Sequence, residues 1–154
     1  MATMMRGRQA IRDFTEHEHR ELTPAVNRIH AIACDAHGAP TTDLSLGVLE
    51  VLRWFDSVLQ PHMAWEEHWL FPQIEARAGT PWVTRSIRFD HQQLNGLAGQ
   101  LRRDHDVLQA RPMRSEVDET RCHLYALEAL VHAHVEREER FLLPLLDGTA
   151  GDEP

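Results

Sequence analysis

The chain contains little cysteine, a single tyrosine, and no long run of apolar or basic residues. Its two cysteines, Cys34 and Cys122, are too few for a disulfide framework and indicate reduced thiols, as in the cytoplasm. No apolar stretch is long enough to span a bilayer, and residues 1–13 lack the apolar block of a secretory signal. Lys and Arg total 16 against 24 Asp and Glu, and this net charge of −8 argues against nucleic acid and membrane surfaces as partners. The residue in excess is histidine, with 11 among 154 residues.

The positions of glycine and proline predict four long helices. Both residues gather near 37–40, 79–81, 110–112 and 147–154, and the segments between them show no strand-like alternation. Thr15 followed by Glu18, and Ser115 followed by Asp118, match capping boxes, and Thr80 precedes a first-turn proline. These helix-start patterns support the division. We therefore expect helices near 15–36, 43–77, 81–110 and 115–145. Short loops between long helices make neighbours antiparallel, so the predicted fold is all-α, an up-down-up-down four-helix bundle.

The same boundaries predict one domain over residues 15–146. A flexible N-terminal segment is expected at 1–14 and a disordered tail at 147–154. Pro24 and Pro61 fall inside predicted helices, where each should remove a backbone hydrogen bond and bend the helix.

The chain repeats itself at an offset of 72 residues. The block 62–72 aligns with the block 134–144, with a histidine, two glutamates, a leucine and a proline matching. The same offset aligns His19 with His91. The predicted bundle is therefore built from two copies of one helical hairpin, related by a pseudo-two-fold axis.

The repeat brings four histidines to one level of the bundle. His19 and His62 are 43 residues apart, as are His91 and His134, and in each hairpin the outward and return paths nearly cancel. All four lie on apolar helical faces, because aliphatic residues recur beside them at steps of three and four. We therefore expect the four imidazoles to point into the core.

Two of these histidines bring a carboxylate to the same face one turn later, Glu66 after His62 and Glu138 after His134. The simpler alternative is a buried His–Glu network without metal. That network must bury two acids with no basic residue on the face to pair them, which costs several kcal/mol for each uncompensated ion. A metal ion removes the penalty because it binds deprotonated carboxylates and neutral imidazoles. The sequence therefore favours a metal centre.

The candidate metal ligands are His19, His62, Glu66, His91, His134 and Glu138. Their two-fold relation favours two ions, one in each hairpin, with both glutamates and an oxo, hydroxo or water ligand bridging them. Two octahedral ions held in this way would keep open positions for a small molecule such as dioxygen. Zinc and manganese also accept imidazole and carboxylate, so the ligand types alone leave the metal open.

The paired His-x-x-x-Glu-Glu-x-x-Leu-x-Pro blocks, each preceded by a lone helical histidine, resemble the hemerythrin-like HHE cation-binding family. The resemblance runs from about Thr15 to Leu146. It implies a four-helix bundle holding a non-haem di-iron centre with bridging carboxylates and an oxo or hydroxo bridge, with the six residues above as ligands. Zinc or manganese is expected to replace iron in some recombinant samples.

Two positions depart from the oxygen-carrying hemerythrins. Those proteins have a fifth histidine one turn after the third-helix ligand, where this chain has Asn95, the repeat partner of Thr23. The resemblance therefore does not extend to reversible oxygen carriage, and Asn95 stays open as a weak ligand, a water anchor or a core-edge residue. Classical members also take the fourth-helix carboxylate five residues after the histidine, which here is Glu139, whereas the repeat favours Glu138.

Other residues near the site have open roles. Glu67 and Glu139 either accept hydrogen bonds from ligand imidazoles or lie in solvent. Cys34 and Cys122 are predicted to be small packing residues. Four aromatic residues have two alternative roles, either to exclude water from the site or to form part of the ordinary core: Trp65, Trp69, Phe71 and Phe141. A supplementary ligand is left open among His17, His30, His68, His123 and His132, while His105 lies about four turns away.

The leading functional hypothesis is a soluble, cytoplasmic di-iron protein that binds or reacts with dioxygen, peroxide or nitric oxide. Its role would be sensing, iron handling or oxidative-stress defence, with or without a redox partner. The alternative is a di-iron enzyme that degrades peroxide as a catalase does, although no proton relay is visible in the sequence. A ferritin-type oxidase uses Glu-x-x-His, an order found once, at Glu16 and His19. The last hypothesis is a metal-free interaction bundle.

Overall fold

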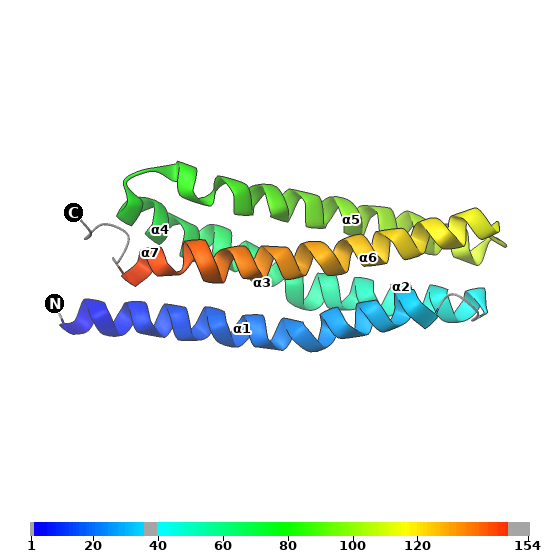
Figure 1. Cartoon of the computed structure of the whole chain (residues 1–154), viewed down its shortest axis with the longest axis horizontal. Coiled ribbons are helices and arrows are strands. Elements are labelled where there is room, and N and C mark those ends of the chain that lie inside the picture. Colours follow the sequence, from blue (N-terminus) through cyan, green and yellow to red (C-terminus); the bar gives the residue numbers. More distant parts are fainter. Residues whose placement is uncertain (1, 36–39, 148–154) are drawn as a thin grey trace.

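The computed structural model describes residues 2–35 and 40–147 and confirms the four-helix bundle (Figure 1). The first helix is α1 (Ala2–Asp35). The second helix is interrupted by two wide turns and comprises α2 (Thr41–Trp54), η1 (Phe55–Leu59), α3 (Gln60–Trp65), η2 (Glu66–Leu70) and α4 (Phe71–Ala78). The third comprises η3 (Pro81–Thr84) and α5 (Arg85–Gln109). The fourth comprises α6 (Arg114–Arg137), η4 (Glu138–Leu142) and α7 (Pro144–Asp147).

Each helix packs against the next along the chain, and the fourth returns to the first. The principal contacts join α1 to α2, α2 to α5, α5 to α6 and α6 to α1. The helices run up and down in turn, so both hairpins close at the same end of the bundle (Figure 1). Among the described residues there is no strand, and no helix is both long and apolar enough to cross a membrane.

The first helix begins earlier than the sequence predicted. Thr15 is fully buried and lies inside α1, which starts at Ala2. A Thr-x-x-Glu pattern marks a helix start only where the preceding backbone leaves the helical conformation, and here no proline precedes Thr15 to force that break. The division into a segment at 1–14, a domain at 15–146 and a tail stays a prediction, and residues 148–154 of that tail lie outside the described residues.

The other helix starts agree in place with the prediction and differ in one detail. The Thr80 hydroxyl accepts the backbone N–H of Trp82 at 3.3 Å, after Gly79 has ended α4 with φ of 68°. At the fourth helix the capping carboxylate is Glu116, which accepts the backbone N–H of Met113 at 2.7 Å. The expected Ser115–Asp118 pair is therefore wrong, because α6 begins one residue before Ser115.

Three wide, π-helical turns each end two residues before a proline: η1 before Pro61, η2 before Pro72 and η4 before Pro144. In η4 the Leu143 N–H donates to the carbonyl of Glu138, five residues back, at 2.9 Å. A proline ring clashes with the carbonyl four residues before it, and a wider turn relieves that clash. The widened turn η1 accommodates Pro61, and α1 continues as one helix through Pro24, while the bends expected at the two prolines stay predictions.

The buried apolar residues form two clusters with the histidine level between them. The larger cluster lies toward the hairpin loops and includes Phe55, Leu59, Leu94 and Leu127. The smaller cluster lies beyond Glu66 and Glu138 along the chain and consists of Leu70, Phe71, Ile74, Ile87, Leu142, Leu143 and Leu146. The wide turns bring consecutive residues to this cluster, so that Leu70 and Phe71 are both fully buried.

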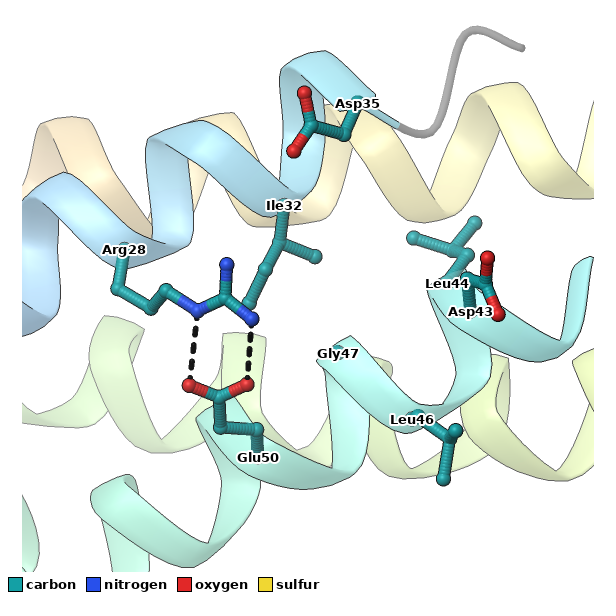
Figure 2. Close-up of a pocket in the computed structure, with 8 residues that line it drawn as sticks. All are labelled: Arg28, Ile32, Asp35, Asp43, Leu44, Leu46, Gly47 and Glu50. Atoms are coloured by element: carbon teal, nitrogen blue, oxygen red, sulfur yellow. Dashed lines mark hydrogen bonds and ion pairs between the residues drawn. The ribbon is translucent and has the colours of Figure 1, made fainter. Parts of the chain in front are cut away.

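At the loop end, α1 and α2 approach closely at Gly47. A Cβ atom there would lie 2.6 Å from Cγ2 of Ile32, so only glycine fits this contact without movement. One turn away, Arg28 and Glu50 bridge the same two helices at the surface, beside a cavity of about 310 Å³ (Figure 2).

Candidate metal centre

All six predicted ligand side chains meet in the interior between the two apolar clusters. They come from all four helices: His19 from α1, His62 and Glu66 from α3 and η2, His91 from α5, His134 and Glu138 from α6 and η4. None is more than 3% exposed, and both glutamates are 0% exposed. The structure thus places the six together as the sequence predicted, although their role as ligands stays a prediction.

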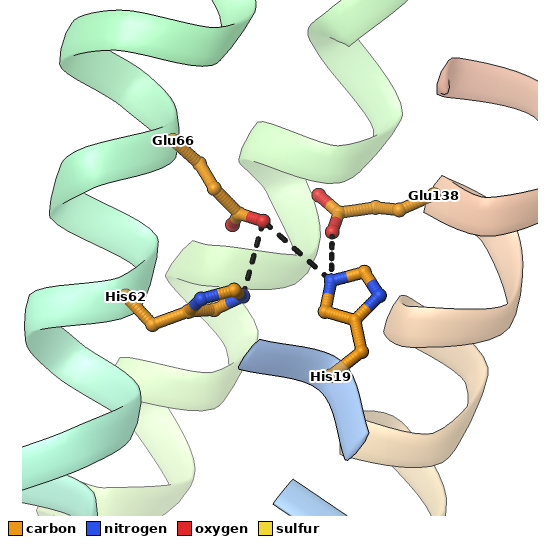
Figure 3. A group of neighbouring side chains, drawn as sticks. All are labelled: His19, His62, Glu66 and Glu138. Atoms are coloured by element: carbon orange, nitrogen blue, oxygen red, sulfur yellow. Dashed lines mark hydrogen bonds and ion pairs between the residues drawn. The ribbon is translucent and has the colours of Figure 1, made fainter. Parts of the chain in front are cut away.

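Their ligand atoms fall into two groups, each compact enough to hold one ion. The first-hairpin group contains His19, His62 and both glutamates (Figure 3), and the second-hairpin group contains His91, His134 and both glutamates. Within each group the ligand atoms lie within 4.8 Å of one another. Glu66 and Glu138 belong to both groups, as bridging carboxylates would.

Glu66 turns one oxygen to each group. Its Oε1 lies 3.1 Å from His62 Nε2 and 3.9 Å from His19 Nε2. Its Oε2 lies 3.3 Å from His91 Nε2 and 3.9 Å from His134 Nε2. This division of the two oxygens is the arrangement that a carboxylate bridging two ions requires.

Glu138 completes both groups from the opposite side. Its Oε2 lies 3.1 Å from His19 Nε2 and 3.8 Å from His134 Nε2. Glu139 instead lies outside, with a side chain 48% exposed. The geometry therefore supports Glu138, which the repeat favoured, over Glu139.

Many of these atoms face one another without forming hydrogen bonds. In the described part of the chain, every buried side-chain nitrogen or oxygen that lacks a hydrogen bond belongs to His62, Glu66, His91, His134 or Glu138. The set includes both oxygens of Glu66 and the Nε2 atoms of three histidines. Leaving a buried polar atom unpaired costs roughly 1–3 kcal/mol. A cluster of such atoms with converging lone pairs fits metal ions, which need acceptors rather than donors.

Without a cation, the centre has to share protons among its acids and imidazoles. Burial opposes ionisation of Glu66, but His19, His62 and His91 prevail and hold its pKa well below the usual range. Burial and the neighbouring Glu66 raise the pKa of Glu138. Burial also opposes a charge on His19, yet Glu138 and Glu66 raise its pKa to about 10. Metal ions would displace these protons, because the ligands bind metal in their deprotonated forms.

A carboxylate from a neighbouring helix faces the outer Nδ1 atom of each histidine. Glu67 Oε1 lies 2.7 Å from His91 Nδ1, and Glu139 Oε1 lies 3.1 Å from His19 Nδ1. These two hydrogen bonds support the predicted role of Glu67 and Glu139 over the alternative of acids free in solvent. Each bond fixes the ring so that Nε2 points to the centre.

The sequence analysis missed the other two outer carboxylates. Glu18 Oε2 lies 3.8 Å from His62 Nδ1, and Asp90 Oδ2 lies 3.9 Å from His134 Nδ1. The signal was present, because Glu18 and Asp90 each precede a predicted ligand and are aligned by the same 72-residue offset. In all four cases the acid of one helix faces the histidine of the next helix, and the fourth helix faces the first.

Asn95 and the repeat partner Thr23 do not enter the centre. Both side chains are exposed, and the Asn95 amide donates to the carbonyl of His91 at 2.9 Å. Of the three roles left open for Asn95, the structure therefore speaks against that of a weak ligand.

The aromatic residues near the site divide into two kinds. Phe71 is fully buried and stacks on His91 with ring centroids 5.5 Å apart, so it shields this imidazole from water. Trp65 is partly buried against the smaller cluster. Trp69 and Phe141 are 65% and 69% exposed, so they neither cover the site nor belong to the core.

The cysteines and the remaining histidines lie outside the two ligand groups. Cys34 and Cys122 are free and exposed, so their predicted role as packing residues is wrong. Both cysteines lie on the solvent side of their helices, and Cys34 Sγ lies 3.4 Å from His30 Nε2 at the surface. His105 and His123 contact Ser45 and Asp104, respectively. No further histidine joins the two ligand groups among the described residues.

Two cavities reach the first-hairpin histidines. One of about 380 Å³ lies between α1 and the fourth helix and is lined by His19, Arg20, His132 and Arg140, among others. The other, of about 250 Å³, includes Pro61, His62 and Trp65 in its wall. Both cavities therefore border the first-hairpin side of the centre.

A family model described as the hemerythrin HHE cation binding domain matches residues 10–146. This range includes all six candidate ligands and all four outer carboxylates. A search of curated proteins and of solved structures gave no match.

Proposed function

The chain belongs to the hemerythrin HHE cation-binding domain family, and from this premise we propose that it binds two iron ions at the six-residue centre. The ligands would be His19, His62 and His91, together with His134, Glu66 and Glu138. Both glutamates would bridge the ions, together with an oxo or hydroxo group. The protein would use this centre to bind or react with dioxygen, peroxide or nitric oxide.

The observation that carries the proposal is the set of buried, unpaired ligand atoms. Glu66 directs its two oxygens at different pairs of imidazoles, and neither oxygen has a well-aligned hydrogen bond. A proton-sharing network would be expected to align donors with these acceptors. Two cations satisfy all the atoms together and balance the buried carboxylate charge.

The surrounding residues support a reactive centre rather than a purely structural one. Glu67 and Glu139 hold the imidazole rings of His91 and His19 in place, and Phe71 excludes water beside His91. The cavities at His19 and His62 leave access for a small ligand. Iron bound there would supply the change of redox state that reaction with dioxygen or peroxide needs. The two free cysteines support a reducing compartment such as the cytoplasm, where the role would be sensing, iron handling or oxidative-stress defence.

Ferrous reconstitution under anaerobic conditions, followed by air, tests this proposal. We expect two irons per chain by elemental analysis and absorption bands of oxo-bridged ferric iron near the ultraviolet edge. Glu138→Ala should lose this spectrum, whereas Glu136→Ala, an exposed glutamate two residues away, should keep it. A colourless wild-type product without iron would contradict the proposal.

The same preparation separates binding from turnover. Adding peroxide to the iron-loaded protein and following oxygen evolution tests the alternative function as a peroxide-degrading enzyme. Steady evolution that Glu66→Ala abolishes would favour the enzyme. A spectral change without sustained evolution would favour a binding or sensing protein.

A further inference from the structure

The two halves of the centre have matching ligands but different supports. His134 in the second hairpin faces Asp90, and its repeat partner His62 faces Glu18. The two separations are nearly equal, at 3.9 and 3.8 Å, so the acids stand in equivalent places. The difference lies in how each acid is held.

Arg137 holds the Asp90 carboxylate in position through two hydrogen bonds. The Nε and Nη2 atoms of Arg137 both donate to Oδ2 of Asp90, at 2.9 and 2.6 Å. The Asp90 side chain is only 9% exposed. Its position behind His134 is therefore fixed before any metal binds.

Glu18 is held less firmly behind His62. Its side chain is 34% exposed and has one more rotatable bond than aspartate. The position that corresponds to Arg137 in the first hairpin is Trp65, whose indole carries no charge. At the position equivalent to Arg137, the first hairpin therefore carries no guanidinium.

The coverage of the imidazoles differs in the same direction. Phe71 stacks on His91, and the guanidinium of Arg88 lies 4.9 Å from the centre of the Phe71 ring. The residue that corresponds to Phe71 in the repeat is Leu143. Both first-hairpin histidines, His19 and His62, line cavities. The second-hairpin group is therefore the better ordered and better covered of the two.

We propose that the centre binds its two metal ions in order, with the second-hairpin group of His91 and His134 filling first and holding its ion more tightly. Arg137 acts as the positioning residue for this group through Asp90. The first-hairpin ion binds second and exchanges with the metal in solution. This inference rests on the proposed metal function and concerns how the two ions differ.

The physical reason is the preorganisation of ligands. Residues that orient a metal-binding histidine typically change metal affinity by about 10–100-fold when they are removed. An ion at the first hairpin has to order Glu18 as it binds, whereas Asp90 is already in place. The two binding steps should therefore be separated by a similar factor, on the order of 10–100-fold.

A titration of the metal-free chain with Co²⁺, against a chelator of known affinity, tests the order. We expect two binding steps of unequal affinity for the wild type. Arg137→Gln should weaken the tighter step by about 10–100-fold and leave the weaker step nearly unchanged. Arg102→Gln, which breaks an exposed Arg–Asp pair with Asp56, is the matched control and should change neither step.

Ligand variants identify which step belongs to which hairpin. His62→Ala should retain the tight step, and His134→Ala should lose it. Loss of the tight step in His62→Ala but not in His134→Ala would overturn the proposed order. Two equal steps in the wild type would also overturn it while leaving the metal function intact. No Co²⁺ binding by the wild type would instead refute the metal function itself.

A measurement on the wild type removes any dependence on the folding of variants. With one equivalent of Zn²⁺ added, histidine side-chain NMR should show the His91 and His134 imidazoles shifted first. Prior or equal shifts of His19 and His62 would contradict the proposal.

Discussion

The apolar core toward the hairpin loops and the ligand layer beside it are built on the same four helices but are satisfied in different ways. In the core, side chains such as Phe55, Leu59 and Leu94 are at most 1% exposed and pack on one another. In the layer, equally buried atoms of Glu66 and His134 have no hydrogen-bond partner. The core is complete as it stands, whereas the layer would be completed by the proposed ions.

This difference separates folding from function in the molecule. The burial of apolar surface drives folding without reference to any ligand. The layer opposes folding unless its charges are balanced, because burying ionised groups is unfavourable. The core should therefore hold the helices together in the metal-free chain, and the ions should add stability to a bundle that is already folded.

Removing the metal is expected to have the largest effect. An ion that binds only the folded chain stabilises it by about 2.7 kcal/mol at a concentration of 100 Kd, and two ions add their effects. The metal-free chain should keep its helical circular dichroism but unfold at a lower temperature. Glu138→Ala serves as the control, since its unfolding temperature should respond little to metal. Loss of the helical signal on chelation would show that core and layer are not separable.

Shortening a core side chain should come next. Phe55 is 1% exposed, and Phe55→Ala should cost about 3–5 kcal/mol in the free energy of unfolding. Because Phe55 lies two helical turns from His62, about 10 Å, the loss should be the same with and without metal. Phe141→Ala, at a 69% exposed position, should change stability little. Urea unfolding of the wild type and of the two variants, with and without metal, measures these losses. A loss at Phe55 that depends on metal would show that the core and the ligand layer are coupled.

The internal repeat explains why the centre could be predicted from sequence. Burying histidines and glutamates on an apolar face costs folding free energy. Their recurrence at one offset therefore indicates that they form one site. His19 and His91 lie outside the longer block, and they were identified by that offset, by their equal 43-residue distance from His62 and His134, and by their apolar helical faces. The Asn95 departure could also be read from sequence, but its exposed position could not.

The remaining features depend on information that helical periodicity does not carry. The wide turn that begins at Glu138 shifts the face that the following residues present, and a fixed 3.6-residue period cannot represent that shift. The contacts of Glu18 with His62 and of Asp90 with His134 cross between helices, so they depend on side-chain reach and packing. The exposure of Cys34 likewise depends on how α1 rotates against α6.

A methyl group placed between α1 and α2 should have a smaller effect than the loss of Phe55. Gly47→Ala would bring Cβ within 2.6 Å of the Ile32 side chain and should cost about 1–3 kcal/mol. Ile32→Ala in the same chain should remove the clash. Gly96→Ala is the control, because no atom lies within 4 Å of its added Cβ, and it should stabilise the helix by about 0.5–1 kcal/mol. Equal thermal stability of the two glycine variants would show that the α1–α2 contact is loose.

The smallest effect is expected at the surface of the same end, where Arg28 and Glu50 form two hydrogen bonds of 2.9 Å (Figure 2). Both side chains are about half exposed, at 54% and 51%, so Arg28→Gln should cost less than about 1 kcal/mol, and less still at high salt. Arg28 lowers the pKa of Glu50, so the contribution of the pair is present above about pH 4.5 and falls as the carboxylate is protonated at lower pH. Urea unfolding at low and high salt measures it. The partly buried Arg137–Asp90 pair acts on the layer and this exposed pair on the core end. A large loss at Arg28 would therefore mean that charge, and not apolar packing, holds the loop end together.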